Sequence, residues 1–474
     1  MKIDGVSHLL AAEANLPQRW QLQCRIRGKT ANVSVEHVLR RLPTRRIAAR
    51  VSLGDRQLFG KIYYHPAKAR REWRRECRLA ADLQKSGVPS PRLVATGNLS
   101  GGGLLALFEF ISPATPFSEA WARVDEKDKP ALFLQLIGLY QKLYRTGLCQ
   151  TDIHLDNFVF DHDQRLMVID PAGVRHINGR LTRYWKNNLA LLLAQFRWQD
   201  SHALVRQALA VLESEKAFSN ISQAQLAARV NRQARLRLER LGKKSLRESS
   251  LATLQNEDRF DCLINRDPRF ERVADRCRIP EQIEKLMSTG RSLKAGNSAT
   301  VVKIEIADRE WVIKRYNVKN NWVAVKRRLG LSRAKRSWQM AFILQELGIR
   351  TPAPVALIAE KGWRGNAYLV TESATGEDIR DYCEKLPVPK SAFSHLFQAL
   401  DFARISHGDL KGSNILCAHD AIALIDLDAM TQHRRPGTFL KCRRKDIDRL
   451  LRNWPPTSPT HETLVKVLKD ISPS

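Results

Sequence analysis

The sequence predicts an α+β protein built from two tandem copies of one bilobal unit, each with a small antiparallel-sheet lobe followed by a mostly helical lobe. Two observations lead to this prediction. A loop containing Asp, an Asn five residues later and a further Asp after a short apolar strand occurs twice, at 150–170 and 407–426. Before each loop, at similar distances, stand a strand that carries a lysine and a Leu-Gln-x-x-Gly segment. Self-similarity of this order indicates an internal duplication.

The second copy of the loop is the clearer one. His407 precedes Asp409 by two residues, Asn414 follows, and the next apolar strand ends at Asp426. Kinase-fold phosphotransferases present a base and two metal ligands in this order. Asp409 can accept the proton of an attacking hydroxyl, while Asn414 and Asp426 offer hard oxygen ligands to Mg²⁺ bridging the phosphates of ATP. A chance turn is the alternative, but the flanking residues favour the functional interpretation.

In the first copy, segments 47–53 and 57–64 predict a hairpin that carries Lys61, followed by a helix at 67–85. In a kinase-like site such a lysine contacts the α- and β-phosphates and is held by a Glu from such a helix. Glu76 is the preferred partner. Glu72, one turn earlier, is the alternative, and an exposed charged helix face is the non-functional interpretation of either acid.

In the second copy, strands at 292–304 and 310–316 correspond to that hairpin, and Lys314 corresponds to Lys61. The turn Gly296-Asn297-Ser298 takes the place of a glycine-rich phosphate loop, although it contains a single glycine.

The helix of the second copy differs from that of the first. In the register of the duplication, Ser337 stands opposite Glu76 and Arg333 opposite Glu72. The sequence therefore offers Lys314 no obvious acid partner. We expect this lysine to be held in another way.

A strongly basic, helical stretch at 224–244 separates the copies. We expect an N-terminal domain at 1–220 and a C-terminal domain at 221–474, with 221–285 as a basic helical lead-in. The stretch carries the cations Arg229, Arg232, Arg235, Arg237, Arg240, Lys243 and Lys244. It is either an anion-binding face or a solvated surface.

Composition limits the class of partner. The 474 residues carry a formal charge of +30, which favours an anionic partner such as a phosphorylated glycolipid, an acidic membrane surface or nucleic acid. We do not expect a nucleic-acid partner, because the sequence shows no recognisable binding module or aromatic stacking platform. The N-terminus lacks the apolar core of a signal peptide, and no apolar run is long enough to span a membrane. We expect a cytoplasmic protein.

The quoted residues resemble the Kdo/WaaP lipopolysaccharide kinase family, a bacterial branch of the protein-kinase-like fold. The resemblance covers nearly all of the second copy and about 59–188 of the first. Its most specific pieces are Leu293-Lys294-Ala295-Gly296-Asn297, Ile313-Lys314-Arg315-Tyr316-Asn317, Ser332 to Trp338, His407-Gly408-Asp409-Leu410-Lys411 and Ile425-Asp426-Leu427-Asp428-Ala429-Met430.

The resemblance implies an ATP- and Mg²⁺-dependent kinase that phosphorylates a hydroxyl of heptose or Kdo in the lipopolysaccharide inner core. Its partners would be the core or lipid A-core glycolipid and the anionic cytoplasmic face of the inner membrane, where the protein would be peripheral. Carried over by position, the residue roles are bases at Asp152 and Asp409, metal ligands at Asn157, Asp170, Asn414 and Asp426, and phosphate contacts at Lys61 and Lys314.

This sequence departs from the family pattern in places. Gln150 stands where a His often precedes the loop Asp by two, and no glycine-rich turn is visible before Lys61. Asp428 stands where a Gly would follow the metal-binding Asp by two. One copy could therefore be a degenerate, scaffolding or regulatory unit, and a protein or small-molecule kinase of the same fold is a further alternative.

Overall fold

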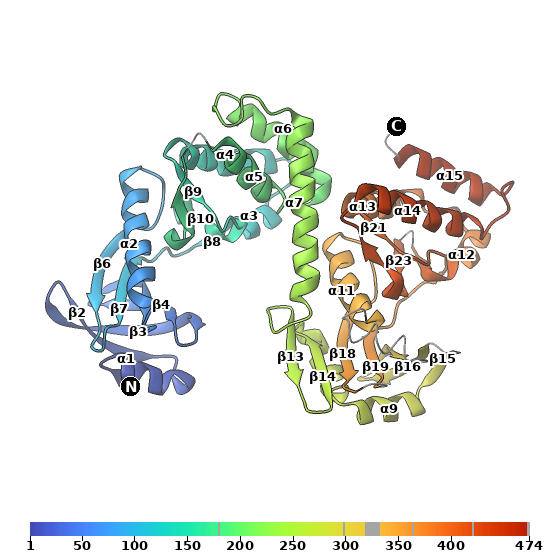
Figure 1. Cartoon of the computed structure of the whole chain (residues 1–474), viewed down its shortest axis with the longest axis horizontal. Helices are drawn as coiled ribbons and strands as arrows, with labels where there is room; N and C mark the ends of the chain where they lie inside the picture. Colours follow the sequence, from blue (N-terminus) through green and yellow to red (C-terminus); the bar gives the residue numbers. More distant parts are fainter. Residues whose placement is uncertain (179–180, 297–298, 318–331, 363–364, 420, 472–474) are drawn as a thin grey trace. The chain divides into compact units, whose positions relative to one another are not determined.

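The computed structural model describes residues 1–178, 181–296, 299–317, 332–362, 365–419 and 421–471. It shows a mixed α/β protein whose chain divides into two compact units, Met1–Val230 and Asn231–Ser474 (Figure 1). Helix α7 (Gln223–Lys244) contains the boundary between them. In each unit a β-sheet comes before a helical part along the chain.

The sheet of the N-terminal unit closes into a barrel. Its strands are hydrogen-bonded in the order β1-β2-β3-β4-β5-β7-β6, and β2 also pairs with β6, which joins the sheet into a ring. β1 runs parallel to β2, whereas the pairs around the ring are antiparallel. The strands are β1 (Lys2–Ile3), β2 (Trp20–Ile26), β3 (Lys29–Leu42), β4 (Arg46–Leu53), β5 (Arg56–Tyr63), β6 (Leu93–Asn98) and β7 (Leu104–Glu109).

Apolar side chains from alternate positions of the strands fill the barrel. Along β4, Ile47, Ala49 and Val51 are fully buried, and the residues between them are half-buried on the opposite face. Gly60 on β5 allows close packing at this point, because a Cβ there would lie 2.9 Å from the Val51 side chain. One side of each strand therefore forms the barrel core and the other side is available to a site.

Barrel closure corrects the expectation of a small antiparallel sheet in this lobe. The predicted hairpin is present as β4 and β5, but the register pairs Arg25↔Asn98 and Ile26↔Gly97 connect β2 to β6. Closure pairs backbone groups that an open sheet edge would leave exposed. The closing strand is β2, which lies before the predicted hairpin in the chain.

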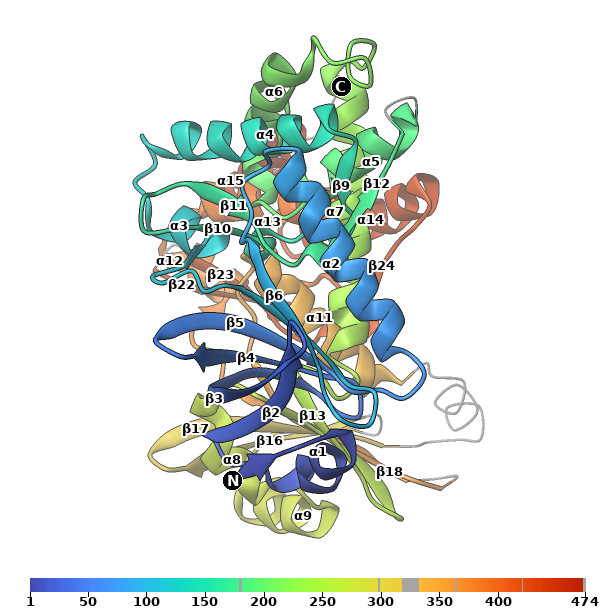
Figure 2. The same cartoon turned by 90° about the vertical axis from the view of Figure 1, so that its left-hand side faces the viewer.

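Helices follow the barrel. Helix α1 (Val6–Ala12) lies at the end of the barrel away from α4, and α2 (Ala69–Lys85) leads toward the helical part (Figure 2). The pair β10 (Phe158–Phe160) with β11 (Leu166–Val168) lies within the first loop, and the pair β9 (Leu148–Gln150) with β12 (Val174–His176) stands at its two ends. The remaining elements are β8 (Thr115–Pro116), α3 (Phe117–Arg123), α4 (Lys129–Arg145), α5 (Thr182–Leu193) and α6 (Ser201–Leu212).

The C-terminal unit has a seven-stranded antiparallel sheet. Its order is β13-β14-β18-β19-β17-β16-β15, so that within the described residues β13 and β15 form the two edges. The strands are β13 (Ala252–Asn256), β14 (Phe260–Asn265), β15 (Arg291–Gly296), β16 (Ala299–Ile306), β17 (Arg309–Tyr316), β18 (Pro354–Glu360) and β19 (Ala367–Glu372).

The expected helical lead-in at 221–285 is wrong in its second half. Helix α7 ends at Lys244, and β13 and β14 then form a hairpin that joins the sheet through β18. Short helices α8 (Glu271–Arg276) and α9 (Pro280–Thr289) follow. Buried Ala252, Cys262 and Leu263 hold the hairpin to the sheet core, and this apolar content outweighs the basic composition that suggested a helix.

Helix α11 (Arg333–Glu346) and the later helices complete this unit. Trp338 of α11 is fully buried, and its indole nitrogen donates to the Ser245 carbonyl at 2.9 Å. Helix α14 (Pro436–Leu451) carries Asp446 and Arg449. The other elements are β20 (Glu377–Asp378), α12 (Ile379–Lys385), α13 (Lys390–Ala403), β21 (Ile405–Ser406), β22 (Ile415–Ala418), β23 (Ala421–Leu424), β24 (Thr431–Gln432) and α15 (Pro459–Ile471).

Within the described residues, no helix is long and apolar enough to cross a membrane. All eight cysteines are free thiols, and burial raises the pKa of several of them, that of Cys149 to about 12. The sequence contains no C-x-x-C pair, and the buried thiols pack in the cores of the two units.

Candidate functional site

In the N-terminal unit, Lys61 lies between two acids. Its ammonium donates to Glu76 on α2 and, at 2.7 Å, to Asp170 after β11. Tyr63 also donates to Glu76, and Glu76 is fully buried. Glu72, the alternative partner, is instead ion-paired with Arg45. The structure thus places Glu76, and not Glu72, against the lysine.

Asp170 sits at a sharp backbone turn with φ of 56°. Burial alone would raise the pKa of its carboxyl, but Lys61, Arg46 and Arg40 outweigh burial and lower that pKa below its ordinary value. Asp170 is therefore an anion at neutral pH. Carboxylate oxygens of this kind suit a divalent cation.

The first loop presents its Asp to solvent. Asp152 is exposed, and its carbonyl accepts a 2.7 Å hydrogen bond from the Asn157 side-chain nitrogen. Because the nitrogen is used in this bond, the side-chain oxygen of Asn157 is left to face away from the loop. Asn157 and Asp170 line the same cavity, as a pair of oxygen donors for Mg²⁺ requires.

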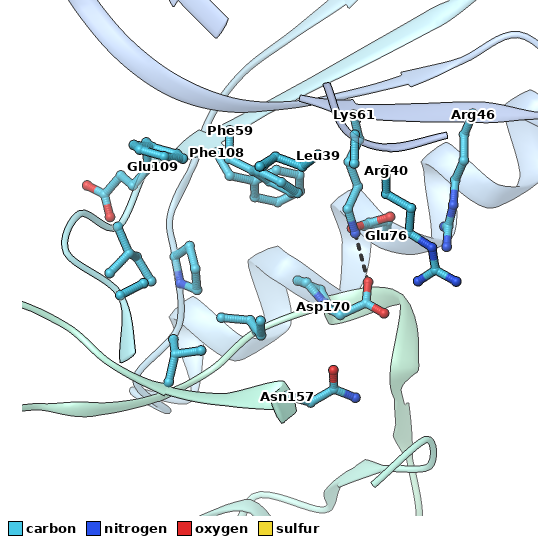
Figure 3. A pocket seen from close by; sticks show the side chains of 18 of the residues that line it. Leu39, Arg40, Arg46, Phe59, Lys61, Glu76, Phe108, Glu109, Asn157 and Asp170 are labelled. Carbon is cyan, nitrogen blue, oxygen red and sulfur yellow. Dashed lines mark hydrogen bonds and ion pairs between the residues drawn. The ribbon is translucent and has the colours of Figure 1, made fainter. Parts of the chain in front are cut away.

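That cavity has a volume of about 390 Å³ and lies between the barrel and the first loop (Figure 3). At one end are Lys61, Glu76 and Asp170. At the other end are the aromatic rings of Phe59 and Phe108, which suit a flat apolar group. The cavity therefore has a charged end and an apolar end, both built from the predicted residues and their neighbours.

In the C-terminal unit, the second loop is held by buried groups. Asp446 of α14 accepts the backbone N–H groups of His407 at 2.7 Å and Gly408 at 2.9 Å. His407 is fully buried, and its Nε2 contacts the Ile425 carbonyl at 3.2 Å. Gly408 has φ of 78°, and a Cβ there would meet the Ala429 carbonyl oxygen at 2.8 Å, so glycine is required.

Asp409, in this loop, is half-buried. Its carbonyl accepts a 2.8 Å hydrogen bond from Asn414, as Asp152 does from Asn157. Arg449 of α14 is ion-paired with its carboxylate, and the Lys411 ammonium lies 3.7 Å away. Two cations therefore stand beside the candidate base.

Lys314 also contacts two acids, but they differ from those of Lys61. Its ammonium is ion-paired with Asp426 and, at 3.0 Å, with Asp428. Burial alone would lower the pKa of Lys314, but Tyr316, Asp428 and Asp426 outweigh burial and raise it above its ordinary value. Asp428 is thus the acid partner of Lys314 that the sequence did not identify.

Asp426 repeats the geometry of Asp170. Its backbone φ is 60°, and although burial would raise its pKa, Lys314, His407 and Arg333 lower that pKa below its ordinary value. Asn414 and Asp426 face one cavity of about 610 Å³, which Lys314 also lines. Their oxygens form a hard donor pair that fits Mg²⁺.

In the C-terminal unit, the two α11 residues that correspond to Glu76 and Glu72 of α2 have other partners. Ser337 bonds to the Tyr316 hydroxyl at 3.0 Å, whereas Arg333 is ion-paired with Asp428. Gly296 ends β15 opposite Ala299. Asn297 and Ser298, the other two residues of the predicted phosphate turn, lie outside the described residues.

Sequence reasoning missed Asp446, Arg449 and the role of Asp428 as a partner of Lys314. Asp446 and Arg449 stand far along the chain on a helix that carried no motif. Asp428 was noticed only as a departure from a Gly. Its position two residues after Asp426 was the available signal, because a short turn can return both carboxylates to one cation.

The C-terminal residues that form this site lie in the part of the chain that matches a known family. Residues 287–468 match the model of the lipopolysaccharide kinase (Kdo/WaaP) family. The matched segment contains β15 to α14, and with them Lys314, Asp409, Asn414 and Asp426. No curated protein matches the chain. The match covers the C-terminal part of the chain and supports a phosphotransferase.

Proposed function

We propose that the C-terminal unit transfers the γ-phosphoryl group of ATP to a hydroxyl of heptose or Kdo in the lipopolysaccharide inner core. The observation that carries the proposal is the meeting of Lys314, Asn414 and Asp426 around one cavity, next to Asp409, inside the residues that match the kinase family. Positioning and charge neutralisation are the two tasks of such a site.

Asp409 acts as the base in this proposal. Its carboxylate accepts the proton of the attacking hydroxyl, and the bond from Asn414 to its carbonyl fixes the loop during the transfer. Lys314 contacts the α- and β-phosphates, and Lys411 and Arg449 add positive charge on the acceptor side. Mg²⁺, held by Asn414 and Asp426, would neutralise charge on the phosphates. Gly296, Asn297 and Ser298 would cover the phosphates.

The N-terminal unit is, in the same proposal, a second kinase-like unit of the tandem. Lys61 with Glu76 would contact phosphates, Asp152 would be the base, and Asn157 and Asp170 would hold Mg²⁺. The same backbone hydrogen bond occurs in both loops and supports this assignment. The amide of Ile169 donates to the Asn157 carbonyl at 2.9 Å, and the amide of Ile425 donates to the Asn414 carbonyl at 3.0 Å. The domain boundary stays a prediction at 220/221.

A unit that binds nucleotide without catalysing transfer is the second candidate for the N-terminal half. The family match begins only at residue 287, and Gln150 replaces the loop histidine. Such a unit would act as a scaffold or regulator of the other. In either case we place the protein peripherally on the cytoplasmic face of the inner membrane, where its glycolipid acceptor is made.

Matched alanine variants of the two loop acids test the proposal. We expect Asp409→Ala to lower phosphoryl transfer to purified lipopolysaccharide core by about 10²- to 10⁴-fold, the range for a general base, with the fold retained. Asp152→Ala in the other loop is the matched variant, and its activity reports whether the N-terminal unit catalyses transfer. Near wild-type transfer by Asp409→Ala would overturn the assignment of the base.

A further inference from the structure

The charged end of the N-terminal cavity holds two arginines that the kinase pattern does not require. Arg40 of β3 and Arg46 of β4 line it, and Figure 3 shows both guanidinium groups beside Lys61 and Asp170. Both lower the pKa of Asp170, which places their charge close to its carboxylate. Within the described part of the chain, neither guanidinium has a hydrogen-bond or ion-pair partner.

The sheet register explains why Arg40 and Arg46 point into the charged end of the cavity. Arg40 pairs with Ala48, and Ala48 pairs with Lys61, so these side chains share one face of the barrel. Arg46, two residues before Ala48, lies on the same face. In the C-terminal sheet the corresponding register partners are Lys294↔Val301↔Lys314, with Ala299 in the place of Arg46.

The turn between these strands cannot serve as a phosphate loop through its backbone. Thr44, at its tip, donates its backbone N–H to the Glu13 carboxylate at 2.9 Å. Leu42 stands where the other unit has Gly296, so a side chain occupies the position of the glycine. The guanidinium groups of Arg40 and Arg46 are therefore available, beside the Lys61 ammonium, as donors at this end of the cavity.

We infer that Arg40 and Arg46 bind the polyphosphate of a nucleotide in the N-terminal cavity, in place of the backbone amides of a glycine-rich turn. Guanidinium groups donate charge-assisted hydrogen bonds to phosphate oxygens in a forked geometry. With Lys61 they bring three cations against the two carboxylates of Glu76 and Asp170. The ligand class is a nucleoside di- or triphosphate; the inference rests on the proposed nucleotide binding by this unit.

Calorimetry on the full chain tests this inference. A background with Lys314→Met and Asp426→Asn removes phosphate contacts of the C-terminal unit, and adenosine, ADP and ATP are then titrated. We expect Arg40→Ala and Arg46→Ala each to weaken ATP binding by about 10- to 100-fold, with adenosine binding unchanged. Arg50→Ala is the matched control, because Arg50 is on the same strand but outside the cavity and 3.6 Å from Glu36.

Each other outcome overturns a defined statement. ATP affinity that the two substitutions leave unchanged overturns the role of the arginines, and equal losses for adenosine and ATP overturn it too, because they indicate a collapsed cavity. A background chain that binds no ATP overturns nucleotide binding by the N-terminal unit itself, and the arginine inference with it.

A second inference comes independently from the acid that holds Lys314. Glu76 lies on α2 of the N-terminal unit, and Ser337 lies at the corresponding position on α11 of the C-terminal unit. The contact described for the Ser337 side chain is with the Tyr316 hydroxyl. Asp428 is buried and contacts Lys314. Arg333 of α11 is ion-paired with its carboxylate, and the Arg336 side chain donates to its backbone carbonyl.

We propose that Asp428 is the positioning residue for Lys314, in place of a glutamate on the helix. The acid now belongs to the loop after Asp426, so the lysine is anchored to the same segment as the candidate metal ligand. Helix α11 is tied to this anchor through Arg333. In this arrangement the position of the lysine does not depend on a carboxylate carried by the helix.

A double-mutant cycle on phosphoryl transfer and ATP affinity tests the proposal, which rests on the proposed function. We expect Asp428→Asn to lower kcat/KM at least about tenfold in the wild-type chain and to have almost no effect when Lys314→Ala is already present. Additive losses would overturn the positioning role. If the wild-type chain transfers no phosphate, the proposed function fails, and ATP affinity in the same cycle still tests Asp428.

A transplant supplies a test that does not depend on the stability of the single variant. Ser337→Glu with Asp428→Gly recreates the arrangement of Lys61 and Glu76. We expect the double variant to recover at least about a tenth of wild-type kcat/KM and to exceed Asp428→Gly alone. No recovery, in a chain with the wild-type circular dichroism spectrum, would contradict the proposal.

Discussion

At the scale of residues, one buried hydrogen bond is made by different side chains in the two units. His407 contacts the Ile425 carbonyl through Nε2, and the Gln150 side-chain nitrogen donates to the Ile169 carbonyl at 3.3 Å. Burial lowers the pKa of His407, so the ring is neutral and its Nε2 carries the hydrogen. Gln150 therefore replaces the donor function of a histidine without its titration.

This equivalence predicts a pH effect on stability. An ordinary histidine has a pKa of about 6.5 in an unfolded chain, so as the pH falls from about 7 to 5 the unfolded state binds a proton that folded His407 does not. The free energy of unfolding should fall over this window. We expect the His407→Gln variant to keep the fold. Its free energy of unfolding should fall less steeply as the pH is lowered.

Urea unfolding of the two chains at several pH values measures the difference. His461→Gln, at a site remote from the second loop, is the control for general histidine loss. Parallel pH curves for the wild-type chain and His407→Gln would contradict a buried neutral His407.

The sequence predicts a contact between two side chains when both belong to one local pattern. The spacing of Lys61 and Glu76 led to two candidate acids, and packing decided between them because only Glu76 lies on the buried face of α2. The contact of Arg449 with Asp409 joins two segments that share no motif. Such contacts depend on tertiary packing and could not be read from spacing.

At the scale of elements, helix α11 anchors the sheet of the C-terminal unit. Trp338 packs against Phe342 with ring centroids 5.5 Å apart and bonds to the carbonyl of Ser245, after α7. The aromatic side chain thus connects the helix to the sheet and to the segment that leads into β13. Its removal would leave a cavity and an unpaired carbonyl.

We therefore predict that Trp338→Ala lowers the free energy of unfolding of the C-terminal unit by about 3–5 kcal/mol. Gln345→Ala, an exposed change on the same helix, should stay within about 0.5 kcal/mol of the wild-type chain. Hydrogen exchange of amides in β17 and β19 measures the loss. A cost below about 1 kcal/mol would show that α11 does not anchor the sheet.

Elements were predicted best where the hydrophobic pattern is regular. The hairpin around Lys61 and the following helix lie within a few residues of their predicted bounds, as β4, β5 and α2. Closure of the barrel was not predictable, because the pairing of β2 with β6 depends on how two distant segments meet. The hairpin of β13 and β14 was hidden by the basic composition around it.

At the scale of the whole molecule, the charge of +30 is the property that local motifs do not explain. The densest basic stretch, α7, is only partly available to a partner. Burial lowers the pKa of Arg235 to about 10, Arg237 is half-buried, and Glu239 is ion-paired with Lys243 and Arg434. Only part of this basic stretch is therefore exposed to a partner.

The exposed arginines of α7 carry a prediction for binding to an anionic membrane surface. Arg232 and Arg240 are exposed, and each cation near an anionic surface contributes about 1 kcal/mol at low salt. We expect the double reversal Arg232→Glu with Arg240→Glu to weaken binding to phosphatidylserine-containing vesicles by more than about tenfold. Vesicle co-sedimentation at low and high salt gives the affinity.

The matched control has the same net charge. Arg70→Glu with Arg71→Glu reverses two exposed arginines at the start of α2, away from the basic stretch. An equal loss in this control would show that net charge alone governs vesicle binding, and salt-insensitive binding would exclude an electrostatic surface.

The central claim is that this chain phosphorylates a sugar of the lipopolysaccharide inner core, with Asp409 as the base. Phosphate analysis of the inner core from a strain that lacks the gene tests it most directly, with the wild-type gene or Asp409→Ala supplied in trans. We expect the deletion strain to lack one core phosphate, the wild-type gene to restore it and Asp409→Ala to fail. An unchanged core phosphate content in the deletion strain would contradict the claim.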